Sequence, residues 1–169
     1  MSQLSGALAV ADTTYVSFSV DSENYAVGVG VVAEIVRFNP DSLTEMPEFP
    51  KFMRGVLNLR GKVFPVMDLR LRFGLNPTPY SDRTVILVIR VKEQTTGLIV
   101  DAVSEVIRIP PEQIEPAPLW KEAGATGLVS GMGKRADGSV SILLDVGKLV
   151  CDYTGEVPVG TNEGGMESS

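Results

Sequence analysis

The stretch Gly55–Leu75, with the sequence GVLNLRGKVFPVMDLRLRFGL, decides how the fold of this chain is interpreted. Two short apolar runs, Gly55–Arg60 and Val63–Met67, flank a tight connection, which is the pattern of two neighbouring strands joined by a turn. Asp68 follows at a position suited to a helix N-cap, and Gly74 at a position suited to a helix end. We therefore expect two strands followed by a short helix over Asp68–Phe73.

The rest of the chain repeats this pattern of short Val- and Ile-rich runs between turn residues. A chain of several short strands at regular spacing is typical of a sandwich or of small barrels, so we expect a mainly β protein with few short helices. A further short helix is expected over Asp145–Val150. Strands are expected at Tyr15–Val20, Tyr25–Val27, Thr84–Val91, Gly97–Val100, Val103–Ile109, Gly127–Met132 and Ser139–Leu144.

The segment Gly28–Val36 fits neither pattern well. Gly28 and Gly30 are poor helix formers, and the β-branched residues around them are stiff. We expect a short helix or an irregular loop here.

The two ends differ from the middle in composition. Residues 1–13 are small and polar and are expected to be a flexible N-terminus, without the basic and apolar regions of a signal peptide. Residues 154–169 are rich in Gly, Glu and Ser and are expected to be a disordered tail. The folded unit should span 14–153. No apolar run reaches membrane-spanning length, so we expect no membrane insertion and a cytoplasmic location.

Composition argues against an enzyme. The 169 residues include no histidine, which removes the commonest general base and metal ligand. The single cysteine, Cys151, is interpreted as a small buried hydrophobe. The acidic pairs Asp101/Glu105 and Glu112/Glu115 lack catalytic partners and are interpreted as solvated charges. We expect no catalysis, no cofactor and no metal.

The charge distribution bears on possible partners. The net charge is −6, but residues 14–153 hold 17 acidic against 15 basic residues. An acidic chain without a basic stripe is a poor nucleic-acid binder. The segment Lys51–Arg72, however, carries six basic residues and one acidic residue. It is either a set of solvated strand ends or a surface for an acidic or polar protein partner.

Several blocks in order resemble the CheW family of chemotaxis coupling proteins. Gly55–Leu75 is similar to the family's signature, and Ala33-Glu34-Ile35 to its V-x-E-I element. The first strand, the central run and the final hairpin with its helix are matched by Tyr15–Val20, Gly97–Pro118, Gly127–Lys134 and Ser139–Val150.

The resemblance implies a fold of two intertwined five-stranded SH3-like β-barrel subdomains. It implies a non-catalytic cytoplasmic adaptor, recruited to membrane-associated arrays, that couples the cytoplasmic tip of chemoreceptors to the regulatory domain of a histidine kinase. A paralogous adaptor for surface motility or another non-flagellar output is the alternative. The kinase-facing surface is expected on exposed aliphatic side chains at the other side of one barrel.

The resemblance also implies the positions that contact the receptor, in a groove between the two barrels. Val85 and Val103 could equally be core residues. Arg60 is expected to pair with Glu34 and to position the receptor surface, and the alternative is an exposed arginine of little consequence. The expected contact positions are Val32, Glu34, Ile35, Gly55, Asn58, Arg60, Val85, Gly97 and Val103.

The chain departs from the family pattern at Gly28 and Gly30, where many relatives carry larger, helix-favouring residues. These glycines could loosen the turn that presents Val32 and Glu34, which puts partner affinity in doubt more than the fold.

Overall fold

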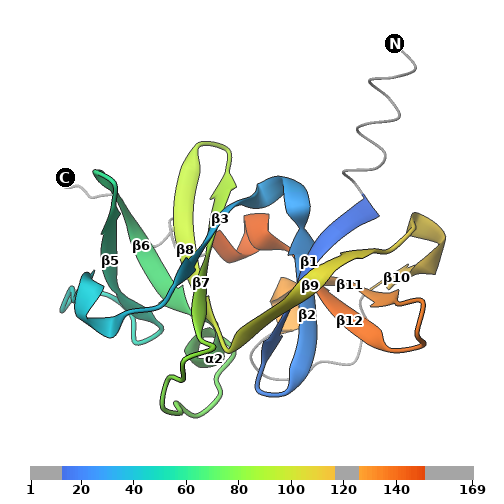
Figure 1. Cartoon of the computed structure of the whole chain (residues 1–169), viewed down its shortest axis with the longest axis horizontal. Coiled ribbons are helices and arrows are strands. Elements are labelled where there is room, and N and C mark those ends of the chain that lie inside the picture. Colours follow the sequence, from blue (N-terminus) through green and yellow to red (C-terminus); the bar gives the residue numbers. More distant parts are fainter. Residues whose placement is uncertain (1–12, 117–125, 151–169) are drawn as a thin grey trace.

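The structure is a computed structural model that describes residues 13–116 and 126–150 (Figure 1). The expectations for the remainder of the N-terminus, for Cys151 and for the tail at 154–169 lie outside the described residues. Thr13 is described and buried, and its carbonyl accepts a hydrogen bond from the Ile109 amide at 2.8 Å. Within the described ranges no helix is long and apolar enough to span a membrane.

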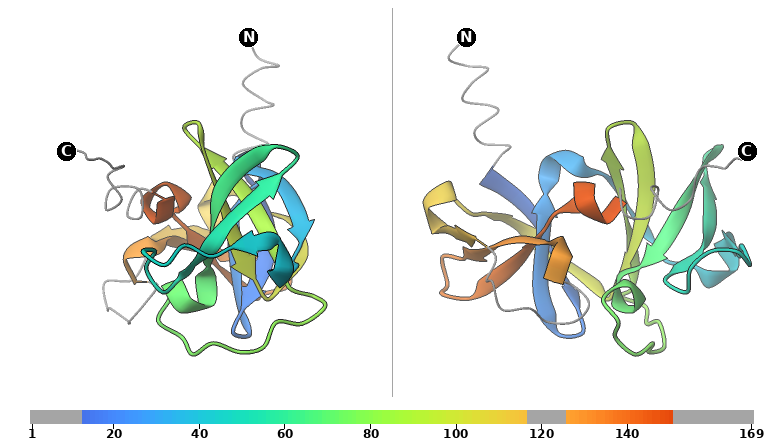
Figure 2. Two further views of the ribbon diagram at one scale, coloured as in Figure 1. Left: turned by 90° about the vertical axis from the view of Figure 1, so that its left-hand side faces the viewer. Right: turned by 180° about the vertical axis from the view of Figure 1, so that it is seen from behind.

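Two sheets lie side by side along the long axis of the molecule (Figures 1 and 2). The chain begins in sheet A with two strands, builds sheet B, and returns to complete sheet A. In spatial order sheet A contains β10 (Ile114–Pro116), β11 (Val129–Lys134), β12 (Val140–Leu144), β2 (Glu23–Gly28), β1 (Thr14–Val20) and β9 (Ala102–Arg108). Sheet B contains β3 (Val32–Arg37), β7 (Val85–Val91), β8 (Gln94–Val100), β6 (Lys62–Asp68), β5 (Met53–Leu59) and β4 (Leu43–Thr44).

The mainly β fold with two intertwined units is confirmed, but each sheet has six strands where five were expected. The difference comes from short strands with little sequence signal. β4 has two residues and pairs with β5, and β10 has three residues and pairs with β11. Strands of this length have no visible alternation of apolar and polar residues, so periodicity does not find them.

The interpretation of Gly28–Val36 as a short helix or loop is right only for its first part. A 3-10 turn, η1, covers Val29–Val31, and the strand β3 follows at Val32–Arg37. Ile35 lies opposite Leu87 in the antiparallel pairing of β3 with β7. Partly buried and exposed residues alternate along β3, which is the behaviour of a strand at the edge of a sheet.

The helix expected after β6 is confirmed as α2, Leu69–Arg72. The Asp68 side chain accepts a hydrogen bond from the Arg70 amide at 2.9 Å, as an N-cap should, and Gly74 follows with a φ of +80°. Residues 146–150 are also helical. Three further 3-10 turns are η2 (Pro40–Ser42), η3 (Pro111–Gln113) and η4 (Thr126–Leu128).

The largest apolar core lies between the two sheets. Phe18 and Val20 of sheet A pack there with Leu87 and Leu98 of sheet B, and all four side chains are fully buried. The opposite face of sheet B holds a second core around Phe64 and Ile86, and the opposite face of sheet A holds a third around Ile109. Both faces of the central strands are therefore buried, and the core that the two sheets share holds them together.

Candidate protein-binding site

An exposed ion pair joins strand β3 to the β5–β6 turn. The Arg60 Nη2 group donates a hydrogen bond to Glu34 Oε1, and the two side chains are 69% and 35% exposed. Arg60 adopts a left-handed φ of 52°, and the next residue, Gly61, has a φ of +86°. Asn58 stabilises this tight turn, because its Oδ1 accepts a hydrogen bond from the Gly61 amide at 3.0 Å. The expected pairing of Glu34 with Arg60 is confirmed.

The ion pair borders a groove of about 270 Å³, called here the ion-pair groove; it is lined by Ala33, Glu34, Leu59, Arg60, Lys62, Phe64, Val88, Arg90 and Thr95. Phe64 and Val88 are buried and contribute apolar surface to it. The hydrogen bond from Arg60 lowers the pKa of Glu34, so its carboxylate is charged at neutral pH. The groove therefore combines apolar surface with fixed charges, which suits a protein side chain more than a small apolar ligand.

A second, wider groove of about 410 Å³ lies where the two sheets meet, and it is called here the junction groove. Ile35 and Val85 line it from sheet B, and Ala102 and Val103 line it from sheet A. Ile35 is 46% exposed, whereas Val85 and Val103 are half-buried and also pack against the core. The two valines therefore pack against the core and also expose part of their surface to the groove, and their contact with a receptor stays a prediction. The expected groove between the two units is present.

The remaining expected contact positions are placed elsewhere. Gly55 is buried with a φ of +144°, and a Cβ there would overlap the Thr44 carbonyl oxygen. A Cβ on Gly97 would lie 2.8 Å from Ile86 Cγ2, so this glycine is required by packing inside sheet B. Val32 is half-buried against the core between the sheets. These three positions line neither groove and offer little surface to a partner.

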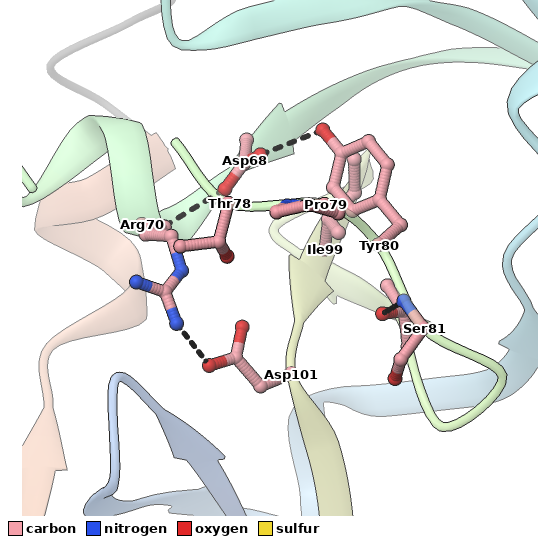
Figure 3. Close-up of a pocket in the computed structure, with 9 residues that line it drawn as sticks. Asp68, Arg70, Thr78, Pro79, Tyr80, Ser81, Ile99 and Asp101 are labelled. Atoms are coloured by element: carbon pink, nitrogen blue, oxygen red, sulfur yellow. Dashed lines mark hydrogen bonds and ion pairs between the residues drawn. The ribbon is translucent and has the colours of Figure 1, made fainter. Parts of the chain in front are cut away.

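A network around Arg70 joins the two sheets at another point (Figure 3). The guanidinium donates to Asp101 at 2.7 Å and to Asp21 at 3.0 Å, and the Arg70 side chain is only 14% exposed. Asp68 accepts a hydrogen bond from the Tyr80 hydroxyl at 2.8 Å. Burial, together with this bond, raises the pKa of Tyr80. We call these five residues the Arg70 network.

Four members of the Arg70 network, all except Asp21, line a pocket of about 210 Å³, and their charged groups are already bound to one another or to the backbone. The carboxylates of Asp68 and Asp101 both accept hydrogen bonds from within the protein. In the described residues no three acidic or cysteine side chains are grouped as metal ligands. The side chains that line this pocket connect parts of the fold, and none of its carboxylates is left free to act as a general base.

Sequence reasoning missed this network because its members are far apart in the chain. Asp101 and Glu105 were interpreted as solvated charges, but each accepts a hydrogen bond from an arginine, Arg70 and Arg135 respectively. The basic segment Lys51–Arg72 is also partly neutralised within the fold, by Glu34 and by the two aspartates bound to Arg70. Helix α2 was the available signal, because Leu69 anchors it in the core and an arginine held next to that core needs a carboxylate partner.

Comparisons with known proteins agree with this architecture. Residues 14–153 match the CheW-like domain. The chain is 34% identical over 136 residues to the chemotaxis protein CheW of Klebsiella aerogenes, covering 80% of each protein. It is 32% identical over 108 residues to the protein FrzA of Myxococcus xanthus, covering 64% of this chain and 68% of FrzA.

The fold is also found in a solved structure. The crystal structure of the scaffolding protein TtCheW from Thermoanaerobacter tengcongensis superposes with a TM-score of 0.72 at 39% identity, covering 78% of this chain and 88% of that one. The domain match spans most of the present chain, and its two intertwined sheets agree with the similarity to that scaffolding protein. The chain therefore belongs to the CheW family of non-catalytic chemotaxis scaffold proteins.

Proposed function

We propose that this protein couples chemoreceptors to a histidine kinase in the cytoplasm, at a membrane-associated receptor array. The observation that carries the proposal is the pair of neighbouring grooves on strand β3. Glu34 borders the ion-pair groove, and Ile35, the next residue, lines the junction groove. Successive residues of a strand point to opposite faces, so one strand serves both grooves.

The junction groove is suited to the apolar face of a receptor helix. Ile35, Val85 and Val103 provide apolar surface there, and the charged residues Arg37, Asp82 and Arg83 also line the groove. An amphipathic helix binds such a groove through the side chains on one of its faces. Strand β3 is at the edge of sheet B, so a helix that crosses this edge also reaches the exposed pair of Glu34 and Arg60, whose polar contacts fix its register. The regulatory domain of the kinase binds elsewhere, which leaves both partners attached at once.

Reconstitution with a receptor fragment and a candidate kinase tests this proposal. The coupling function predicts a ternary complex and altered kinase activity, with no turnover by this chain alone. Ile35→Asp replaces apolar surface of the junction groove with a carboxylate and should weaken receptor binding at least about tenfold, since the apolar contact is lost and the receptor helix would have to remove water from the new charge. Val140→Asp is the matched control, because Val140 is 44% exposed and lies on sheet A.

The outcome is judged on both variants together. Equal loss of receptor binding in Ile35→Asp and Val140→Asp would show a general effect on the fold and would contradict the groove assignment. A chain that binds the receptor fragment but never the kinase would contradict the coupling function itself.

A paralogous adaptor for another output is a second candidate, and the similarity to FrzA supports it. The two candidates differ in the kinase and receptor that they bind. Pull-down from the source organism with the full chain, followed by identification of the kinase, distinguishes them. Recovery of a kinase encoded with flagellar genes would favour the first candidate, and recovery of a kinase for a non-flagellar output would favour the second.

A further inference from the structure

The ion-pair groove carries more positive charge than its own residues neutralise. Arg60 is paired with Glu34, but Lys62 and Arg90 make no hydrogen bond or ion pair with any side chain of the described residues. Both residues are exposed beside the apolar surface of Phe64 and Val88. Two unpaired cations beside an apolar surface favour a ligand that is acidic and partly apolar.

The same chain contains a segment with this chemistry. Residues 151–169 hold four acidic and no basic residues, and the Glu156 carboxylate is followed directly by Val157, Pro158 and Val159. The last described residues before the segment, Leu149 and Val150, are buried in the core between the sheets together with Leu98 of strand β8. The segment therefore starts from a fixed point, and β8 also contributes Thr95 to the groove.

The length of the segment is sufficient to reach the groove. Nineteen residues span up to about 65 Å when extended, whereas a folded unit of this size has a radius of gyration of about 14 Å. A covalent tether of this kind presents its charges at an effective concentration on the order of 1 mM. At that concentration a contact with a dissociation constant of about 1 mM would be roughly half populated within the molecule, even though it would be negligible between two molecules in dilute solution.

We propose that the acidic segment 151–169 of this chain occupies the ion-pair groove when no partner is bound, with its carboxylates near Lys62 and Arg90. It then acts as an intramolecular competitor for that groove. The contact itself does not depend on the proposed function, but its consequence for receptor binding does. Neutralising the segment should raise the apparent affinity for the receptor fragment on the order of twofold to fivefold, because a larger fraction of molecules is competent to bind.

Paramagnetic relaxation in the full-length chain tests the contact without any partner present. A nitroxide is attached at Thr161→Cys in a Cys151→Ser background, and the amide signals of Ala33, Arg90 and Thr95 are recorded. We expect these signals to lose intensity, while the signal of Ser139, on the β11–β12 turn, does not. The loss should disappear in high salt, since exposed charges are then screened.

Charge variants make the assignment specific. The triple change Glu156→Gln, Glu163→Gln and Glu167→Gln should abolish the intensity loss, and so should Lys62→Glu combined with Arg90→Glu. Combining that groove reversal with lysines at the three glutamate positions should restore it. The proposal would be overturned if the wild-type chain showed no intensity loss at these amides, or if the loss occurred elsewhere on the surface. It would also be overturned if the loss persisted in the triple variant. Receptor binding without a segment contact contradicts this inference alone, and a segment contact without receptor binding contradicts only the coupling function.

Discussion

Arg60 and Arg70 lie ten residues apart in one segment, and both bind carboxylates, but their surroundings differ. The Arg60 side chain is 69% exposed and has one partner, whereas the Arg70 side chain is 14% exposed and has two. An exposed pair contributes little to stability, because water competes for both charges. A buried arginine with two partners cannot lose them without a large cost.

The contrast assigns different tasks to the two arginines. Arg70 joins helix α2 to Asp21 in the β1–β2 turn and to Asp101 between β8 and β9, so it connects the two sheets. Arg60 projects from a turn and can exchange Glu34 for a partner at little cost in folding free energy. A scaffold needs both kinds of contact, one to hold its shape and one to be used by partners.

Removing the buried arginine should have the largest effect. Arg70→Ala leaves Asp21 and Asp101 without their shared cation and should lower the free energy of unfolding by about 2 to 3 kcal/mol. Urea denaturation measures this change. Arg70→Lys is the matched control and should recover part of the loss, since a lysine cannot donate to both carboxylates in the same geometry.

A loss of stability well below about 1 kcal/mol in Arg70→Ala would contradict the assignment of Arg70 as the link between the sheets. The folded fraction of this variant should still bind the receptor fragment, because Arg70 lines neither the ion-pair groove nor the junction groove.

The exposed arginine should show the opposite behaviour. Arg60→Ala should leave the urea midpoint unchanged and weaken receptor binding at least about tenfold, if the proposed register contact is correct. Titration with the receptor fragment measures the affinity. Lys92→Ala is a control, because Lys92 has a left-handed φ of 49° in a turn, as Arg60 does, but does not line the groove. Wild-type affinity in Arg60→Ala would remove Arg60 from the site.

The core beside α2 should respond to alkaline pH. Burial raises the pKa of Tyr25 to about 12, and its ring lies 5.2 Å from that of Phe73, at the end of α2. Above pH 10 the unfolded chain ionises this tyrosine while the folded chain keeps its proton, so stability falls as the pH rises from about 10 to about 12.

We expect the loss from Tyr25 to reach about 1 kcal/mol at pH 11. Urea denaturation across this range measures it, and Tyr25→Phe should flatten the slope. Tyr80→Phe is a useful comparison, since the pKa of Tyr80 is raised as well and its ionisation adds to the same loss of stability at alkaline pH. A slope that is identical in all three proteins would contradict the assignment.

Sequence patterns predicted the parts of this structure that depend on local chemistry. The Asp68 cap, the helix that follows it and most long strands were found because their signals lie within a few residues of each other. The pairing of Glu34 with Arg60 followed from the family resemblance, and the structure confirms it. The role of the nine expected positions in receptor binding stays a prediction.

The parts that were missed depend on contacts between distant segments. Asp21 and Asp101 are separated by 80 residues, and only the fold brings both to Arg70. Strand β3 was missed because Gly28 and Gly30 suggested a loop, although the β-branched residues that follow favour a strand and its pairing with β7 fixes that conformation. The sequence also could not show that Lys62 and Arg90 lie in one groove, because they come from different strands that only the fold brings together.

The smallest expected effect is on the titration of Glu34. Arg60 lowers the pKa of this carboxyl mainly through its hydrogen bond, so Arg60→Gln should raise the pKa towards the ordinary value for glutamate. A lowered carboxyl pKa stabilises the folded state above the unfolded pKa, and this contribution is lost as the pH falls through the folded pKa. The titration of Glu34, followed by NMR through the chemical shift of its carboxyl carbon, should therefore change in Arg60→Gln. The urea midpoint should not change, because an exposed pair contributes little to stability. Arg90→Gln is the matched control, since Arg90 lines the same groove without binding Glu34 and should leave the pKa lowered. Equal titration of Glu34 in wild type and Arg60→Gln would show that the pair does not persist in solution, and the distinction between the exchangeable Arg60 and the fixed Arg70 would then rest on Arg70 alone.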